Sequence, residues 1–225
     1  MIEIEETVEN RIYNIYEKDY FKGIKLVVFD MDGVLLKNRN SWDVIMNKCM
    51  KKHVMGSRMV YTFDYIHKNG VPDRLYQNLT ESKIKTYLNL NDMTSNVLRT
   101  VDYLRQRKIK TAIVSAGSHI FAGYISDLMG IDYYIGNEVE VNEHKFVKNV
   151  DPARKDINVE SIQHDLGILP EETVSVGDSF MDLSMKRKSK YFVAFNPASY
   201  RTLEYSDFTV ESTNLYDIVD KLTGH

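Results

Sequence analysis

Short apolar runs that end in polar residues constrain the fold of this chain more than any other feature. Ile24 to Phe29 (IKLVVF) is rich in β-branched residues and leads into the turn FDMDGV, and similar runs cover 111–114, 173–176 and 191–195. Such runs are typical of strands that are buried on both faces. Helical patterns cover 94–107, 118–129 and 156–167. Strands that alternate with helices predict an α/β fold with a doubly wound, Rossmann-like parallel sheet.

The segment 37–93 interrupts this alternation. It has no convincing buried strand, but it has helical patterns around 42–54, 58–68 and 80–88. We interpret it as a small helical domain inserted after the first strand. The expected domains are therefore a core of residues 1–36 and 94–225 and an inserted domain of residues 37–93. We also expect a helix at 5–18 and a hairpin at 137–149.

Length, charge and cysteine content exclude several classes of protein. A chain of 225 residues is long enough for one large domain, or for a core with a small accessory domain. The net charge of −3 provides no basic field for nucleic acid or an anionic membrane. Cys49 is the only cysteine, which excludes an intrachain disulfide and any multi-cysteine metal site. No apolar run approaches the ~20 residues of a membrane span, and the acidic start does not resemble a signal peptide. We expect a cytoplasmic monomer or homodimer.

Polar residues follow the apolar runs at the place where doubly wound sheets bind ligands, beyond the carboxyl ends of the strands. Carboxylates gathered there repel each other unless cations lie among them. An oxygen-only set without a Cys or His cluster favours a hard cation, and Mg²⁺ is the one that keeps waters beside a phosphate. A hydroxyl and a lysine in the same set predict a phosphoryl site. The residues concerned are Asp30, Asp32, Ser115, Ala116, Gly117, Lys155, Asp178 and Asp182.

Each of these pieces is ordinary on its own. Two aspartates that flank a turn are typically solvated or capping residues, a lone serine is typically a helix cap, and a lone lysine typically lies on the surface. The sequence DxDG also begins a calcium loop, but Val34 and Leu35 stand where that loop needs an acid and a glycine. The joint occurrence of the pieces, in order and at strand or helix ends, favours the phosphoryl site.

The motifs resemble those of the haloacid dehalogenase superfamily of aspartate-nucleophile phosphatases, in its phosphoserine-phosphatase-like branch. FDMDGV resembles the first motif, IVSAG the second, Lys155 the third and VGDSFMD the fourth. The resemblance implies that Asp30 is the nucleophile and Asp32 the general acid and base. It implies that Mg²⁺ is bound by Asp30, Asp178 and the backbone carbonyl of Asp32, with Asp182 in support. It implies phosphate binding by Ser115, Ala116, Gly117 and Lys155, and a mobile cap at 37–93.

Two positions depart from enzymes that are specific for phosphoserine. Those enzymes carry a glutamate nine residues after the nucleophile, where this chain has Arg39, and an asparagine three residues after the first acid of the fourth motif, where it has Met181. Both departures argue against phosphoserine. Arg39 favours a substrate whose second group is anionic, although a solvated arginine is the ordinary alternative. Further candidates for the inner face of the cap, for which packing or surface roles are the ordinary alternative, are Trp42, Arg58, Tyr65 and Arg74.

We therefore expect Mg²⁺-dependent hydrolysis of a small phosphorylated metabolite, other than phosphoserine, through an aspartyl-phosphate on Asp30. The alternatives are a phosphotransferase or phosphomutase of the same fold and a catalytically silent protein that binds a phosphate ligand. The length and the helical insertion disfavour a receiver-like module. The sequence has no GxGxxG after the first strand and no GxxxxGK[ST], which excludes a dehydrogenase and an ordinary nucleotide triphosphatase.

Overall fold

The computed structural model describes residues 19–51, 80–140 and 145–224. Within them lies a seven-stranded sheet of order β4-β3-β2-β1-β5-β6-β7. All strands run parallel except β4, which pairs antiparallel with β3. The strands are β1 (Leu26–Phe29), β2 (Lys110–Ser118), β3 (Tyr133–Glu140), β4 (Lys145–Val147), β5 (Thr173–Gly177), β6 (Tyr191–Phe195) and β7 (Phe208–Val210). The predicted doubly wound sheet is confirmed.

The switch point of the sheet lies between β1 and β5, because the chain returns to the other side of β1 after β4. Phe29 of β1 pairs with Ile113 of β2 and with Val176 of β5. The three central strands therefore reach the same edge together. Every residue of β1 and β5 is buried, as their apolar sequences predict.

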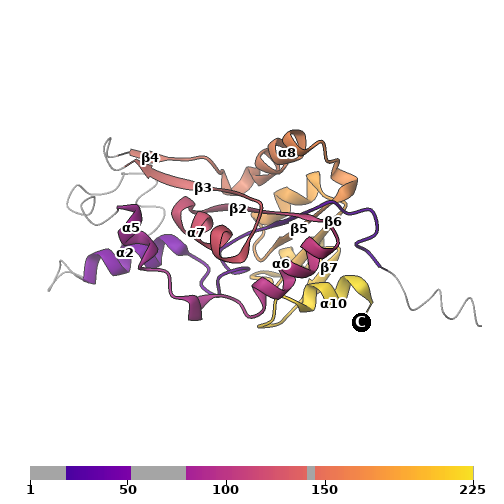
Figure 1. Ribbon diagram of the computed structural model, residues 1–225, viewed down its shortest axis with the longest axis horizontal. Helices are drawn as coiled ribbons and strands as arrows, with labels where there is room; N and C mark the ends of the chain where they lie inside the picture. The colour runs from indigo at the N-terminus through magenta and orange to yellow at the C-terminus, as the bar shows by residue number, and fades with distance from the viewer. Residues whose placement is uncertain (1–18, 52–79, 141–144, 225) are drawn as a thin grey trace, which may run out of the picture.

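Helices cover both faces of the sheet (Figure 1). Apolar residues of α6 (Val97–Gln106), α7 (His119–Met129) and α10 (Asp217–Thr223) join the hydrophobic cluster on one face. Those of α8 (Lys155–Leu166) and the 3₁₀ helix η4 (Asp182–Lys188) join the cluster on the other. The remaining short helices of the core are η2 (Pro152–Arg154), η3 (Pro170–Glu172) and α9 (Tyr200–Tyr205). None of the described helices is long and apolar enough to cross a membrane.

The segment expected as an insertion leaves and re-enters the core at adjacent points. The Lys37 amide donates to the Asp92 carbonyl over 2.8 Å, and the Thr94 amide donates to the Leu35 carbonyl over 2.9 Å. The described parts of this segment form α2 (Ser41–Lys51), α5 (Glu81–Lys85) and the 3₁₀ helix η1 (Leu90–Asp92). Residues 52–79 are outside the described part of the chain, so the predicted helix at 58–68 lies there, as do Arg58, Tyr65 and Arg74; the helix expected at 5–18 is outside it as well. The boundaries 37–93 stay a prediction.

The hairpin expected at 137–149 is confirmed by the pairing of Glu138 with Val147 and of Glu140 with Lys145. Its first strand begins earlier than the sequence pattern indicates. Residues 133–135 of β3 pair in parallel with β2 before the strand continues into the hairpin. The first half of β3 therefore belongs to the central parallel sheet, and its second half forms the hairpin with β4.

Candidate active site

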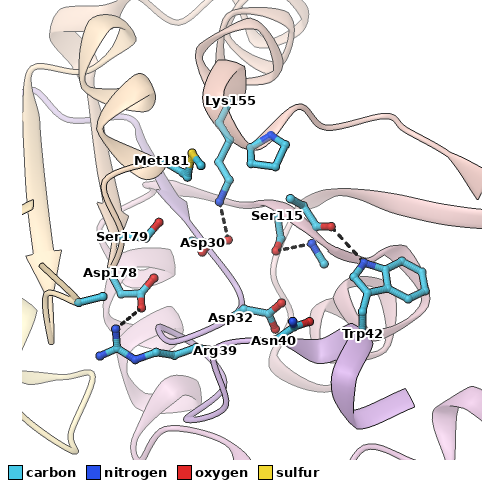
Figure 2. A pocket seen from close by; sticks show the side chains of 14 residues that line it. Asp30, Asp32, Arg39, Asn40, Trp42, Ser115, Lys155, Asp178, Ser179 and Met181 are labelled. Carbon is cyan, nitrogen blue, oxygen red and sulfur yellow. Dashed lines mark hydrogen bonds and ion pairs between the residues drawn. The ribbon is translucent and has the colours of Figure 1, made fainter. Parts of the chain in front are cut away.

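A cleft of about 260 Å³ opens at the carboxyl edge of the sheet (Figure 2). Seven of the eight residues that the sequence places at the site line it, and the eighth, Asp182, is fully buried behind it. The lining residues are Asp30, Asp32, Arg39, Asn40, Trp42, Ser115, Ala116, Gly117, Pro152, Lys155, Asp178, Ser179, Met181 and Ala198. The common edge of β1, β2 and β5 is what brings segments 30–42, 115–117 and 178–181 together.

Lys155 carries the central positive charge of the site. It is the first residue of α8, only 3% exposed, and its Nζ lies 2.8 Å from Asp30 Oδ1 and 2.5 Å from Asp182 Oδ1. Burial alone would lower the pKa of Lys155, but the charges of Asp182 and Asp30 outweigh it and raise the pKa above its usual value. The ammonium group therefore stays charged inside the protein.

Asp182 is fully committed to contacts within the protein. Its Oδ1 pairs with Lys155, and its Oδ2 accepts hydrogen bonds from the Asp178 amide, the Ser179 amide and the Ser179 hydroxyl over 3.1, 2.9 and 2.8 Å. These bonds fix the loop that follows β5. Asp182 thus orients both Lys155 and the backbone at Asp178.

The surroundings of Asp30 and of Asp178 both disfavour negative charge on the carboxylate. Burial, with the nearby charge of Asp182, raises the pKa of Asp30 to about 6 despite the contact with Lys155. Burial, with the charges of Asp30 and Asp182, raises the pKa of Asp178 to about 8, and the Arg39 guanidinium opposes this rise from 3.0 Å. An additional positive charge nearby would favour the ionised form of both carboxyl groups.

Asp32 is held by the first turn of α2. Its Oδ2 accepts hydrogen bonds from the Ser41 amide over 3.0 Å and the Ser41 hydroxyl over 2.9 Å. Its Oδ1 is buried and has no hydrogen-bond partner within the described residues. Burial, followed by the charge of Asp30, raises the pKa of Asp32 to about 7. A carboxyl group with a pKa near neutrality can both give and take a proton, as a general acid and base must.

The segment 115–117 forms the opposite wall. Ser115 is buried, and its hydroxyl accepts a hydrogen bond from the Gly117 amide over 3.1 Å. The Ala116 carbonyl accepts from Trp42 Nε1 over 3.1 Å and from Asn137 Nδ2 over 2.9 Å. A Cβ at Gly117 would lie 2.6 Å from Asp32 Oδ2, so only glycine lets this wall approach Asp32.

Ser41 and Asn137 also support the site, although no sequence pattern predicted them. Ser41 is fully buried, and besides its bonds to Asp32 its Oγ accepts from the Ser118 amide over 3.1 Å. A serine at the start of a helical pattern signals a cap, and its contact with Asp32 exists only in the folded chain. Asn137 bonds the Val150 amide and carbonyl, which ties β3 to the segment before Lys155. Asn137 lies at the start of the predicted hairpin, and the hairpin pattern does not indicate that its side chain bonds Val150.

The donor set fits a divalent metal ion. Ligand oxygens of Asp30, Asp178 and Asp182 all lie within 4.8 Å of one another. With Asp32, four carboxylates meet two cations, Lys155 and Arg39, at the cleft. Both oxygens of Asp182 are engaged, whereas the ion pairs with Lys155 and Arg39 involve one oxygen each of Asp30 and Asp178, so these two side chains can still offer an oxygen to an ion. Carboxylate oxygens without sulfur or imidazole favour a hard cation such as Mg²⁺, Ca²⁺ or Mn²⁺.

Comparisons with known proteins identify the family of the chain. Residues 24–189 match the family model of the haloacid dehalogenase-like hydrolases. Phosphoserine phosphatase of Methanocaldococcus jannaschii is 27% identical over 211 residues, which cover 88% of this chain and 97% of that protein. The enzyme of Archaeoglobus fulgidus is 25% identical over 211 residues, 88% of this chain but only 60% of that longer protein.

Solved structures give the same result. A phosphoserine phosphatase in its apo form superposes with a TM-score of 0.66 and 26% identity, over 88% of this chain and 98% of that one. A phospho-aspartyl intermediate analogue of phosphoserine phosphatase gives the same TM-score, identity and coverage. The chain belongs to the haloacid dehalogenase-like hydrolases and is a phosphatase of their phosphoserine-phosphatase-like branch.

Proposed function

We propose that this protein hydrolyses a small phosphorylated metabolite through a covalent phosphoryl intermediate on Asp30, with Asp32 as general acid and base. The observation that carries the proposal is the pairing of two differently tuned carboxyl groups at the end of β1. Asp30 contacts the Lys155 ammonium at 2.8 Å, whereas Asp32 is bonded to uncharged Ser41, and burial raises the pKa of Asp30 to about 6 and that of Asp32 to about 7. Two carboxyl groups with separate environments can serve as nucleophile and as proton carrier in one site.

The reaction has two displacements at phosphorus. In the first, an Asp30 oxygen attacks phosphorus, the bond from phosphorus to the ester oxygen breaks, and Asp32 gives its proton to that oxygen. In the second, water attacks phosphorus, Asp32 takes a proton from the water, and the bond from Asp30 to phosphorus breaks. Inorganic phosphate and the free alcohol are the products. Lys155 lies beside Asp30 throughout, where its charge offsets the negative charge of the phosphoryl oxygens.

Mg²⁺ is the cofactor we propose, with Asp30, Asp178 and the backbone carbonyl of Asp32 as its protein ligands. When bound, it neutralises charge on the phosphoryl group so that an anionic nucleophile can approach. Asp182 supports the site through its bonds to Lys155 and to the Asp178 amide. Ser115, together with the Ala116-Gly117 segment, lines the cleft as the proposed phosphate-binding wall.

The proposed substrate is a metabolite other than phosphoserine. The relatives above are named phosphoserine phosphatases, but in this chain the cleft is lined by Arg39 and Met181 at the two positions where the sequence departs from the phosphoserine-specific pattern. Net charge and cysteine content favour a cytoplasmic protein that acts without nucleic acid or a membrane, as a monomer or homodimer. Residues 37–93 are proposed as the cap that selects the leaving group.

The test is release of inorganic phosphate from p-nitrophenyl phosphate and from a panel of phosphorylated metabolites, with Mg²⁺ and with EDTA. We expect Asp30→Asn to lower the rate by about 10³-fold or more, because it removes the nucleophile. The matched control is Asp165→Asn, the same chemical change at an exposed residue outside the cleft. That variant should retain the wild-type rate.

A rapid-quench experiment with substrate labelled in the phosphoryl group separates the possible outcomes. Label on wild-type protein in a hydroxylamine-sensitive bond, absent from Asp30→Asn, supports the covalent intermediate. Label that moves to an added alcohol instead of water identifies a phosphotransferase. A folded wild-type protein that neither releases phosphate nor takes up label contradicts the proposal.

A further inference from the structure

Arg39 lies against Asp178, one of the two carboxylates free to hold a cation (Figure 2). Its Nη1 is 3.0 Å from Asp178 Oδ2, and its Nη2 donates to the Asn196 carbonyl over 2.9 Å. The Arg39 side chain is 49% exposed, whereas that of Asp178 is 5% exposed. The guanidinium therefore reaches a buried carboxylate from the solvent side of the cleft.

The second anchor of Arg39 is itself held by hydrogen bonds. Asn196 follows β6 and has a left-handed backbone conformation with φ of 46°. Its side chain bonds both the carbonyl and the amide of Ser212, over 2.6 and 2.9 Å. The Asn196 carbonyl is thus held in place, and it directs Arg39 toward Asp178.

The two cations of the cleft divide the acidic cluster between them. Lys155 pairs with Asp30 and Asp182, and in the described part of the chain Arg39 is the only cation paired with Asp178. Oxygens of these three carboxylates lie within 4.8 Å of one another, so a divalent ion bound among them would lie close to the guanidinium. Like charges at such separations repel strongly where water is scarce.

We propose that Arg39 is an internal competitor of the divalent cation: its guanidinium serves as the counter-ion of Asp178 until the metal ion takes that carboxylate. This inference rests on the proposed function, because it assumes that Asp178 holds the ion. Coupling between two ligands of one site is reciprocal, so the ion weakens the Arg39 contact as much as Arg39 weakens ion binding. Arg39 then sets the metal-ion concentration that the protein needs.

The test measures metal binding directly, without turnover. Mn²⁺ is titrated into the metal-free 225-residue chain in oxygen-free buffer at pH 8.5, where Asp178 is largely ionised, and free Mn²⁺ is followed by electron paramagnetic resonance. We expect Arg39→Gln to lower the dissociation constant by about tenfold, because the competing charge is gone. Arg39→Lys keeps the charge and should stay within about threefold of wild type. The matched control is Arg105→Gln, which removes an arginine paired with Asp102 on the surface of α6 and should change nothing.

Asp178→Asn tells the possible failures apart. If it abolishes Mn²⁺ binding and Arg39→Gln binds as weakly as wild type or more weakly, Arg39 is not a competitor and the inference is wrong while the metal site stands. If Asp178→Asn binds like wild type, the ion is held elsewhere and both the inference and the proposed metal site fail. Circular dichroism of each variant checks that it is folded.

Discussion

Gly33 and Gly23 are two glycines with nearly the same left-handed backbone and different neighbours. Their φ angles are +84° and +81°, but a Cβ at Gly33 would lie 2.4 Å from Asp178 Oδ2, whereas one at Gly23 would meet nothing within 4 Å. Both alanine substitutions cost about 1 kcal/mol of stability in backbone strain. Only Gly33→Ala displaces Asp178, so we expect about a hundredfold loss of phosphate release from it and little from Gly23→Ala. If steady-state assays gave equal losses of phosphate release for the two variants, backbone strain and not displacement of Asp178 would be responsible.

Residue positions at the site could be predicted where the local sequence determines them. Asp30 and Asp178 directly follow buried strands, and their apolar runs reveal where those strands end, whereas Ser115 follows an apolar run but lies within β2, which continues to Ser118. Ser41 and the Arg39–Asp178 ion pair could not be predicted in this way. Ser41 meets the Ser118 amide across 77 residues of sequence, and Arg39 meets the Asn196 carbonyl across 157. Such contacts depend on how the chain returns to the core, which local patterns do not encode.

At the scale of elements, burial decides what the sequence reveals. Strands β1 and β5 are buried throughout and appear as continuous apolar runs. Strand β7 has three residues, of which only Val210 is buried. The short helices α9 and α10 lie next to polar turns. Strand β7 lies at the sheet edge, where one neighbouring strand suffices and side chains are partly exposed, whereas α10 buries Ile218, Val219 and Leu222 by packing on a face of the sheet. Tertiary pairing, not an intrinsic pattern, forms them.

Asp132 joins the starts of β2 and β3. It accepts hydrogen bonds from Lys110 Nζ, the Thr111 amide and the Thr111 hydroxyl over 2.6, 2.9 and 3.1 Å. Burial alone would raise the pKa of Asp132, but these bonds outweigh it and lower the pKa below its usual value. A carboxyl group with a lowered pKa in the folded state contributes stability above its unfolded pKa and loses it as pH falls through the folded value.

We therefore expect Asp132→Asn to destabilise the protein by about 1 kcal/mol at pH 7, a value kept small because the site is partly exposed. The difference from wild type should shrink as the pH falls below about 4. Urea unfolding at several pH values measures this. A difference that stays constant with pH would mean that the amide substitution perturbs packing rather than charge.

At the scale of the whole molecule, the fold concentrates uncompensated negative charge at its switch point. The edge that collects Asp30, Asp32 and Asp178 also buries them, and the pKa of each is raised by burial and by neighbouring carboxylates. Such an arrangement reduces the stability of the metal-free fold in exchange for a site that can hold a cation. The charge balance of the whole chain, only −3, gives no sign of this local excess.

Replacing one of these carboxylates should therefore stabilise the metal-free protein. The pKa of Asp178 is raised to about 8 by burial and by Asp30, so its ionisation destabilises the fold progressively as pH rises from about 4 to 8. In EDTA at pH 8 we expect the free energy of unfolding of Asp178→Asn to exceed that of wild type by about 1 kcal/mol or more. For a chain of this size, each kcal/mol raises Tm by about 2–4 °C. Asp178→Asn also loses the ion pair with Arg39, but because the Arg39 side chain is half exposed, this loss is smaller than the expected gain in stability.

Mg²⁺ should make the wild-type protein more stable than Asp178→Asn. An ion that binds only the folded state adds about 2.7 kcal/mol at a hundred times its dissociation constant, and Asp178→Asn cannot gain this because it lacks the ligand. Thermal unfolding of both proteins in EDTA and in Mg²⁺, at pH 5 and pH 8, gives the four comparisons needed. An Asp178→Asn protein that is less stable than wild type in EDTA at pH 8 would mean that the Arg39 ion pair stabilises the fold more than the carboxylate repulsion destabilises it. The excess negative charge would then not be a cost that the bound ion relieves.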